Sequence, residues 1–581
     1  MSADLRSLWQ GRRVPSWLAL FAPTIVGTLR SGYDLVRLRG DVFGGVTAAV
    51  IALPLALAFG VASGAGAIAG LYGAIALGFF ASAFGGTPSQ VSGPTGPMTV
   101  VMAAVIATHA TSLPEAFTVV ILGGLIQIVL GMLRVGKYIA YTPYSVVSGF
   151  MTGIGVIIII LQILPFIGEP ASAQGVLGTF GTLSRPTELS FHPGTIALAG
   201  ICLAGVIFWP AGLQKVVPAS LAVLVLGTLG ATFFVDGTPV IGEVPTGLPS
   251  LITPTLSVDR WPQLLQGGFI LALLGSIDTL LTSLVADSIT RTQHDSDKEL
   301  VGQGIGNCIA GLIGGLPGAG ATMRTVVNIR AGGRTPVSGV VHALLLLALA
   351  LGLGPVVANV PHAVLAAILM KVGWDIIDWG YLKRVRRAPR EKLAVMLVTF
   401  ALTVFVDLIM AVGVGIILAS FVNSRWLAQE QLKGLRQTAG DDDADHLTDE
   451  EKALLRPTNG RVLVTVLHGT FSYASARELA RRASAKISGV DVAVYDFSQV
   501  AYVDTSAALA IEEMLVQAQS HGMHVLVAGL AGAARETLEN LGVLDRVPAG
   551  QIFPTRSAAI AAAVRHCESL ERNRRAEPAP A

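Results

Sequence analysis

An acidic residue lies inside one of the longest apolar stretches of the chain. Asp278 is flanked by leucine, isoleucine and glycine, and Thr282 follows four residues later on the same face of a helix. An ionisable side chain within a membrane span is costly and marks a candidate functional site. A carboxylate, hydroxyl groups and carbonyls of a broken helix together suit Na⁺. The alternatives are a proton site at Asp278 and a purely structural hydrogen bond to a neighbouring helix.

The other oxygen ligands are expected from the second of two similar segments, one in each half of the chain. Each segment pairs a Gly-Gly-x-Pro sequence with a Gly- and Thr-rich start to a short apolar helix. They comprise residues 85–88 followed by 92–99, and residues 314–317 followed by 318–324. Matched interruptions in two halves are typical of transporters with inverted repeats. The carbonyl of Gly320 and the hydroxyl of Thr322 would join Asp278 and Thr282 around Na⁺.

The same two segments favour an anion as the second ligand. A helix that begins inside the membrane exposes unpaired backbone N–H groups and the positive end of its dipole. Two such helix starts facing each other would hold one small anion without a basic side chain. Arg324, two residues past Thr322, could add positive potential. Glycine-rich packing kinks are the alternative, which the matched pair disfavours.

Asp287, a second acid on the same predicted helix, has a different role. At about 100° per residue it points away from Asp278. Arg291 follows one turn later, near the basic side of the membrane, so the sequence predicts a structural ion pair between Asp287 and Arg291.

The elements that hold these residues are membrane spans. The chain has 581 residues, of which 13% are charged, against about 25% in soluble domains. Its mean hydropathy is +0.65, so lipid has to face much of the surface. A polytopic α-helical membrane protein is therefore expected. The apolar stretches lie near 41–61, 66–84, 94–108, 115–134, 143–167, 193–209, 215–235, 263–289, 299–313, 321–329, 337–354, 360–377, 391–407 and 410–426.

Basic residues fall mainly on one side of these spans. They are Arg6, Arg12, Arg13, Arg30, Arg37, Arg39, Arg134, Lys137, Lys215, Arg291, Lys298, Arg330, Arg334 and the cluster at 383–392. The positive-inside rule predicts that this side and both termini lie in the cytoplasm. The expected location is the cytoplasmic membrane, which the chain crosses several times. Nucleic-acid binding would be another use of the cluster, but its position beside a span explains it better, and no nucleic-acid partner is expected.

The composition changes beyond Arg425, where a small soluble α/β domain is expected. Strands are predicted at 462–466, 492–496 and 524–528, with helices near 473–487, 506–520 and 531–541. The acidic run 441–445 indicates a solvated linker. The expected parts are a cytoplasmic segment 1–38, a transport domain 39–427, a linker 428–459, the α/β domain 460–570 and a disordered tail 571–581.

Several motifs make the chain similar to the SulP family of anion transporters. In the membrane part they are Arg39–Val50, Ala69–Gly73, Arg324–Asn328 and Ala331–Pro336. The tail resembles a STAS domain through Tyr495–Ser498 and Val503–Ser506. The resemblance covers nearly the whole chain. It implies about fourteen spans in two inverted seven-helix repeats, divided into a core and a gate, with the STAS domain attached.

Within the family, the chain most resembles the sodium-coupled bicarbonate transporters. The segments 56–64, 94–102 and 281–287 carry that resemblance. It implies uptake of bicarbonate with Na⁺ by an elevator-like mechanism. Na⁺ would bind at Asp278, Thr282, Gly320 and Thr322, and the anion between the helix starts at Thr95, Gly96, Ala321 and Thr322. Asp at position 278, where many relatives have Glu, is consistent with the sodium-coupled type.

Other functions remain open at the level of sequence. A sulfate or dicarboxylate carrier, coupled to protons or to Na⁺, would use similar sites. A membrane sensor that signals through the STAS domain is an alternative of a different class. An enzyme is not expected, because the sequence offers no nucleophile–base pair, P-loop or metal cluster, and no organic cofactor is implied. Ser506 occupies the position that is phosphorylated in related regulators. The preferred interpretation of the STAS domain is that it forms a homodimer or regulates the transporter.

Overall fold

The computed structural model describes two compact units, Met1–Ile417 and Leu418–Ala581. The described residues are 18–30, 32–139, 143–172, 175–185, 189, 192–214, 217–235, 237–242, 249–255, 258–352, 357–384, 387–406, 408–439, 446–483 and 489–576. The acidic run 441–445 and the last residues of the expected tail, 577–581, lie outside this set.

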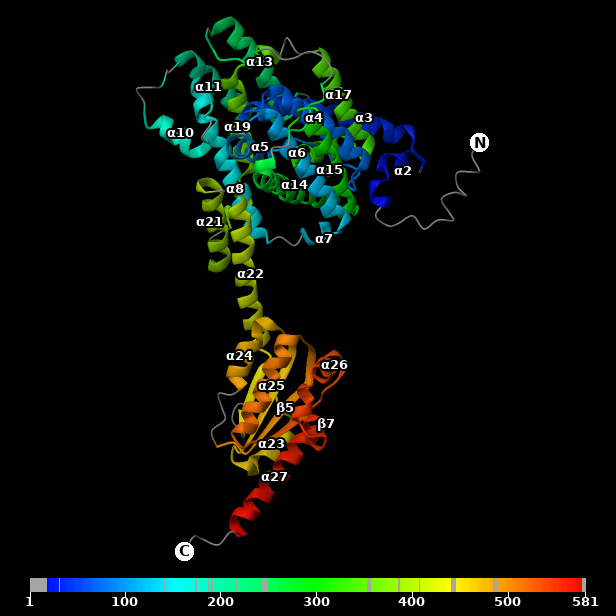
Figure 1. Ribbon diagram of the computed structural model, residues 1–581, viewed down its shortest axis with the longest axis vertical. Helices are drawn as coiled ribbons and strands as arrows, with labels where there is room; N and C mark the ends of the chain where they lie inside the picture. Colours follow the sequence, from blue (N-terminus) through cyan, green and yellow to red (C-terminus); the bar gives the residue numbers. More distant parts are fainter. Residues whose placement is uncertain are drawn as a thin grey trace, which may run out of the picture. The chain divides into compact units, whose positions relative to one another are not determined.

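The first unit is helical, and each expected span contains a helix (Figure 1). The first half holds α3 (Leu35–Ala62), α4 (Ala67–Phe84), α5 (Gly96–Ala104), α6 (Leu113–Met132), α8 (Tyr144–Leu161), α11 (Pro193–Ile207) and α13 (Ala219–Phe234). The second half holds α14 (Trp261–Thr290), α15 (Ser296–Leu312), α16 (Thr322–Arg330), α17 (Pro336–Gly352), α19 (His362–Ile376), α21 (Arg390–Phe405) and α22 (Leu408–Leu432). Short helices connect them, among them α7 (Gly136–Ile139), α9 (Ile163–Ile167), α10 (Gly175–Leu183), α12 (Ala211–Gln214) and α20 (Trp379–Leu382).

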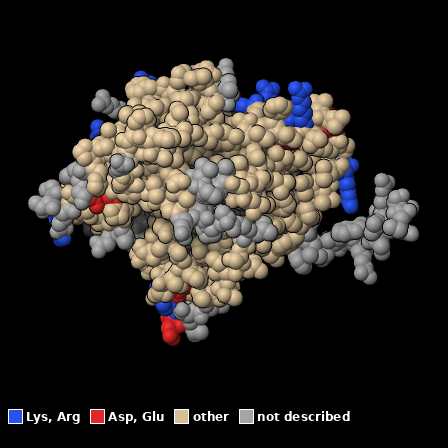
Figure 2. Space-filling model, turned by 90° about the horizontal axis from the view of Figure 1, so that it is seen from above, with Lys and Arg blue, Asp and Glu red and all other residues tan. Residues whose placement is uncertain are grey.

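Six described helices are long and apolar enough to cross a membrane by themselves. They are Leu35–Ala62, Ala67–Phe84, Leu113–Met132, Tyr144–Ile167, Trp261–Thr290 and Met410–Leu432. Figure 2 shows a surface on which uncharged residues predominate, in keeping with the composition of the chain. The protein is a helical membrane protein with an additional α/β domain.

Helix packing at the centre of the first unit relies on glycine. Helix α15 packs against both α4 and α6, and these helices lie together in Figure 1. Where α6 and α15 cross, a Cβ on Gly124 would lie 2.6 Å from the carbonyl oxygen of Gly304, and a Cβ on Gly304 would lie 2.5 Å from that of Gly124. The two backbones are therefore in direct contact, as small residues permit in membrane helices.

The second unit contains a five-stranded sheet in the order β3-β4-β5-β6-β7. The strands are β3 (Leu435–Ala439), β4 (Val462–Phe471), β5 (Val492–Val503), β6 (His524–Ala528) and β7 (Ile552–Phe553). Strand β3 is antiparallel to β4, and the remaining pairs are parallel. The helices are α23 (Asp449–Leu455), α24 (Tyr473–Ala483), α25 (Thr505–Ser520), α26 (Gly532–Asn540) and α27 (Arg556–Ala576). Two separate apolar clusters pack against the sheet.

The expected linker 428–459 differs from the structure. Its described parts hold the end of α22, strand β3 and helix α23, so the α/β unit begins well before residue 460. The sequence pattern hid β3 because only Thr438 of its five residues is buried, as suits an edge strand. Helix α27 likewise continues to Ala576, past the expected end at residue 570.

An ion pair fastens α27 to α23 in this unit. Arg556 donates to both carboxylate oxygens of Glu451, at 3.0 and 2.8 Å, and Ser557 donates to Oε1 at 2.8 Å. The backbone N–H of Thr448 adds a bond at 2.9 Å. Burial alone would raise the pKa of Glu451, but these donors together lower it to about 2.

We therefore predict an acid-dependent loss of stability in the fragment Leu418–Ala581. A depressed folded-state pKa contributes stability that is present above the ordinary pKa of glutamate and is lost as the pH falls towards about 2. Thermal midpoints measured from neutral pH downwards test this. Glu451→Gln is expected to lower the midpoint at neutral pH and to flatten its acid dependence. The exposed neighbour variant Glu450→Gln is the control, and matching profiles for both variants would contradict the assignment.

Candidate functional site at the crossing of two broken helices

Two unwound segments, one from each half of the chain, meet at the centre of the first unit. Strand β1 (Ser92–Gly93) pairs antiparallel with β2 (Ala319–Gly320), and all four residues are buried. Helix α5 begins at Gly96, just after β1, and helix α16 begins at Thr322, just after β2. The two Gly- and Thr-rich segments singled out in the sequence thus form one crossing from which two helices start.

The crossing requires glycine because the two segments approach closely, with backbone against backbone at Gly318 and a side chain against backbone at Gly320. A Cβ on Gly318 would lie 2.2 Å from the carbonyl oxygen of Gly93, and one on Gly320 would lie 2.5 Å from the side-chain nitrogen of Gln90. Real Cβ atoms do not come this close to other heavy atoms. The glycines are therefore explained by close approach of the two segments.

The oxygen atoms expected to bind Na⁺ lie partly together. The hydroxyl of Thr282 donates to the carbonyl oxygen of Gly320 at 2.9 Å and lies 2.7 Å from the hydroxyl of Thr322. The hydroxyl of Thr279, also on α14, accepts a hydrogen bond from the N–H of Gly320 at 3.0 Å. Asp278 lies one turn before Thr282 on the same helix and is buried. The oxygens of Thr282, Gly320 and Thr322 are joined to one another by hydrogen bonds from the hydroxyl groups. A bound cation would replace these hydrogen bonds.

Asp278 also reaches the other broken helix. The hydroxyl of Thr95, the N-cap residue of α5, donates to Oδ2 of Asp278 at 2.8 Å. One carboxylate therefore joins α14, which carries Thr282, to the expected anion site. A small hollow lies beside Asp278 and is lined by apolar side chains, namely Val146, Val147, Phe150 and Met151 of α8, Leu274, Ile277 and Leu281 of α14, and Val412 of α22.

The residues expected to bind the anion lie at the two helix starts. Neither N-cap residue, Thr95 or Ala321, caps its helix through a side chain. In α5 the first backbone N–H to bond within the helix is that of Thr99, and the N–H of Gly96 precedes it. The N–H of Ala321 is already bonded to the carbonyl oxygen of Val91 at 3.0 Å. On this side, donors for an anion therefore begin at Thr322 rather than at Ala321.

Arg324 supplies a buried positive charge next to the crossing. It is 2% exposed, and its guanidinium donates to the carbonyl oxygen of Pro94. One of its terminal nitrogens has no hydrogen-bond partner among the described residues. That nitrogen lies so close to Gly93 that a Cβ there would be 2.5 Å away. The side chain of one half thus braces the unwound segment of the other.

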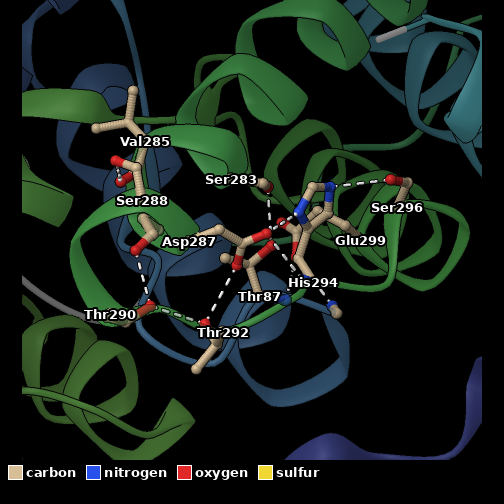
Figure 3. Close-up of polar contacts among 12 residues, drawn as sticks. Thr87, Ser283, Val285, Asp287, Ser288, Thr290, Thr292, His294, Ser296 and Glu299 are labelled. Atoms are coloured by element: carbon tan, nitrogen blue, oxygen red, sulfur yellow. Dashed lines mark hydrogen bonds and ion pairs between the residues drawn. The ribbon is translucent and has the colours of Figure 1, made fainter.

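The structure adds three polar residues of α15 that the sequence analysis missed. The carboxylate of Glu299 accepts the N–H groups of Gly86 and Thr87 at 2.9 and 2.8 Å, and the side-chain amide of Gln90 at 2.7 Å. These contacts hold the segment that leads into β1, and Figure 3 shows Glu299 close to Thr87.

The other two residues of this set continue the same stripe. Gln303 donates to Ser92 of β1 and, at 3.0 Å, to Glu299. Asn307 accepts the N–H of Gly318 at 2.9 Å and donates to its carbonyl oxygen at 3.1 Å. Residues 299, 303 and 307 recur every four positions in an otherwise largely apolar helix, so they share one face. That spacing was the signal in the sequence that could have found them.

The prediction of an ion pair between Asp287 and Arg291 is wrong, because Asp287 has His294 as its partner. Asp287 binds the ring of His294 at 2.7 Å and the backbone N–H of the same residue at 3.0 Å (Figure 3). Arg291 takes a left-handed conformation with φ of 57°, which ends α14 and turns the chain back. The resulting loop brings His294, three residues further on, to Asp287.

This loop contains a Ser–His–Asp chain, which the sequence analysis did not expect. His294 lies 2.9 Å from the hydroxyl of Ser296 and 2.7 Å from Asp287. A triad of this kind needs an oxyanion hole and a substrate cleft as well. The pockets that include Asp278, Phe269, Ser506 and Gln162 in their linings do not include these three side chains. These contacts hold the loop between α14 and α15 in one conformation.

Paired broken helices that start at one buried crossing define the class of membrane transport proteins with inverted repeats. The chain belongs to the Sulfate permease family, which matches residues 38–399, and the STAS domain matches residues 454–559. The expected resemblance to the SulP family with a C-terminal STAS domain is confirmed.

Two curated relatives span nearly the whole chain. The Bicarbonate transporter BicA of Picosynechococcus sp. is 47% identical over 541 residues, covering 91% of this chain and 95% of that protein. The Putative sulfate transporter YvdB of Bacillus subtilis is 29% identical, covering 90% of this chain and 97% of that protein. Both are named as transporters, which fits the expectation that the chain is not an enzyme.

Solved structures match as well. The transmembrane domain of a cyanobacterium bicarbonate transporter BicA is 52% identical, with a TM-score of 0.62, and covers 66% of this chain and 99% of that chain. Murine Solute Carrier 26 family member A9, an anion transporter in the inward-facing state, is 19% identical with a TM-score of 0.78, covering 96% of this chain and 97% of that chain. The second match shows a shared fold.

We predict that Glu299→Gln destabilises the first unit. The substitution places an amide NH₂ or a weaker oxygen acceptor against the donors of Gly86, Thr87 and Gln90. A buried donor left unsatisfied costs about 1–3 kcal/mol. The thermal midpoint of the detergent-solubilised protein is expected to fall. The exposed variant Glu391→Gln, with the same chemical change, should leave it unaltered. Equal midpoints for the two variants would rule out a structural role for Glu299.

Proposed function

We propose that the chain carries bicarbonate into the cell together with Na⁺. The identity of 47% with a bicarbonate transporter, over nearly the full length of both proteins, supports bicarbonate as the cargo. The observation that carries the coupling is the oxygen cluster of Thr282, Gly320 and Thr322, placed one helical turn from the buried carboxylate of Asp278.

Charge explains why the two ions would travel together. Asp278 is buried, and an isolated buried carboxylate is costly unless a positive charge compensates it. Na⁺ bound by Asp278, Thr282, Gly320 and Thr322 would add to the positive charge that the buried Arg324 already places beside the crossing. The bond from Thr95 to Asp278 then connects the cation site to the start of α5, where the anion is expected. Bicarbonate would accept N–H donors from the first turns of α5 and α16, which carry positive partial charge.

An elevator-like movement is the mechanism we infer. Helices α3, α4, α6, α14, α15 and α17 pack on one another around the crossing, and α8, α11, α13, α19 and α21 pack in a second group. We assign the first group to the expected core and the second to the expected gate. The hollow beside Asp278 is lined by apolar side chains of α8 and α14, which form few directional bonds. Such a contact lets one group slide against the other.

A second candidate is transport of sulfate. It is favoured by the 29% identity with a putative sulfate transporter. Coupling to protons through Asp278, dicarboxylate transport and anion sensing through the STAS domain are further alternatives. The proposed setting is the cytoplasmic membrane, with both termini and the STAS domain in the cytoplasm, as the basic loops suggest. We also propose that the protein forms a homodimer through the STAS domain.

Uptake into proteoliposomes tests the proposal. Labelled bicarbonate should accumulate faster under an inward Na⁺ gradient than without one, and faster than labelled sulfate. Bicarbonate flux that is equal in both conditions would contradict sodium coupling. Sulfate flux exceeding bicarbonate flux would favour the second candidate, and binding without flux would favour a sensor.

Two variants of α14 address the coupling ion directly. Asp278→Asn is expected to abolish Na⁺ stimulation, and Thr282→Val to raise the Na⁺ concentration for half-maximal uptake by about tenfold, because one lost ligand interaction of about 1.4 kcal/mol has that effect. Thr282→Ser keeps the hydroxyl and should be close to wild type. Ser288→Ala, which removes an exposed hydroxyl of the same helix, is the control. Full Na⁺-dependent activity of Asp278→Asn would eliminate the proposed site.

A further inference from the structure

A cluster of exposed basic side chains lies between two apolar helices of the first unit. Helix α19 ends at Ile376 and helix α21 begins at Arg390. The described residues of the connection and of the first turn of α21 expose five basic side chains, namely Lys383, Arg384, Arg387, Arg390 and Lys392. We refer to these five residues as the basic connection.

The protein provides little negative charge to balance the basic connection. Asp375 is paired with Lys371 at 2.5 Å. Asp378 accepts hydrogen bonds from the hydroxyls of Tyr144 and Ser148, at 2.8 and 2.7 Å, and caps α20. Across the described part of the chain, none of the five basic residues forms an ion pair within 4.0 Å. Glu391 is the acid that remains nearby, so the connection keeps a net positive charge.

Aromatic residues place the same connection at the edge of the hydrocarbon layer. The rings of Trp374 and Trp379 lie 4.4 Å apart, and the indole N–H of Trp379 donates to the carbonyl oxygen of Trp374 at 2.9 Å. Trp374 is 52% exposed. Tryptophan is enriched at membrane–water interfaces, where its ring lies at the level of the lipid headgroups. Charge and aromatic residues therefore occupy the same short stretch.

We propose that the basic connection binds the headgroups of anionic phospholipids. Clusters of basic residues directly beside a membrane helix attract anionic lipids, with about 1 kcal/mol for each Lys or Arg near the surface. A nucleic acid would use the charges as well, but the basic connection lies directly between two apolar helices, α19 and α21, which brings it to the surface of the bilayer. Asp375 is paired with Lys371, and the oxygens of Asp378 are occupied by hydroxyl and backbone donors, so a lipid phosphate is the counter-charge that remains for these residues.

The lipid would act on the proposed gate. Helices α19 and α21 both pack against α8, whose residues line the hollow beside Asp278. Lipid bound at the basic connection holds these helices at one depth in the bilayer while the core moves. This consequence rests on the proposed elevator mechanism, but the lipid site does not.

Lipid binding to the purified full-length chain tests the proposal without any measurement of transport. Native mass spectrometry of the detergent-solubilised protein would follow titrations with phosphatidylglycerol and with phosphatidylcholine. We expect phosphatidylglycerol to bind more tightly, and the preference to weaken as salt is added. The triple variant Lys383→Gln, Arg384→Gln, Arg387→Gln should bind phosphatidylglycerol about a hundredfold more weakly, because three losses of about fivefold multiply.

A triple variant with the same change of charge is the control. Arg477→Gln, Arg565→Gln, Arg572→Gln alters three exposed arginines of the α/β unit and should leave binding unchanged. If the first triple variant fails to fold, the single variant Arg387→Gln is expected to weaken binding about fivefold. Equal affinity for the two lipids, or equal losses in both triple variants, would overturn the proposal. Displacement of the lipid by an equal concentration of inorganic phosphate would assign the surface to soluble anions instead, and so would also overturn it.

Discussion

The backbone pairing of β1 with β2 is the constraint on which the first unit depends. Within a membrane, each N–H and C=O group must find a partner in the protein, because lipid offers none. Breaking two helices at the same depth exposes several such groups. Pairing Ser92 with Gly320 and Gly93 with Ala319 satisfies part of them, and each broken segment supplies the partner that the other needs.

The surrounding polar side chains are consequences of the same constraint. Glu299 and Asn307 bond further backbone groups on either side of the crossing, and Gln303 bonds the hydroxyl of Ser92. Arg324 bonds the carbonyl oxygen of Pro94. These contacts leave the first-turn N–H groups of α5 and α16 as the available donors. The candidate anion site is thus formed by backbone N–H groups that the helix breaks expose and that have no partner in the described parts of the surrounding helices.

Much of this could be predicted from the sequence because membrane spans and helix breaks have strong local signals. Apolar length located the helices, and glycine with proline located the crossing. The partner of Asp287 could not be predicted, because it depends on the left-handed turn at Arg291. Strand β3 was missed because an edge strand needs little apolar pattern. The partners of Glu299 could not be predicted, because they come from a segment more than two hundred residues away.

The polar stripe of α15 also bears on how the chain enters the membrane. Asp297, Lys298 and Glu299 open this helix, and it is not among the described helices apolar enough to cross a bilayer by themselves. Charged residues within a span oppose insertion. The donors that hydrogen-bond the carboxylate of Glu299, including Gly86 and Gln90, are synthesised some two hundred residues earlier. We therefore expect α15 to enter the bilayer stably only where the segment before β1 is already in place to accept it.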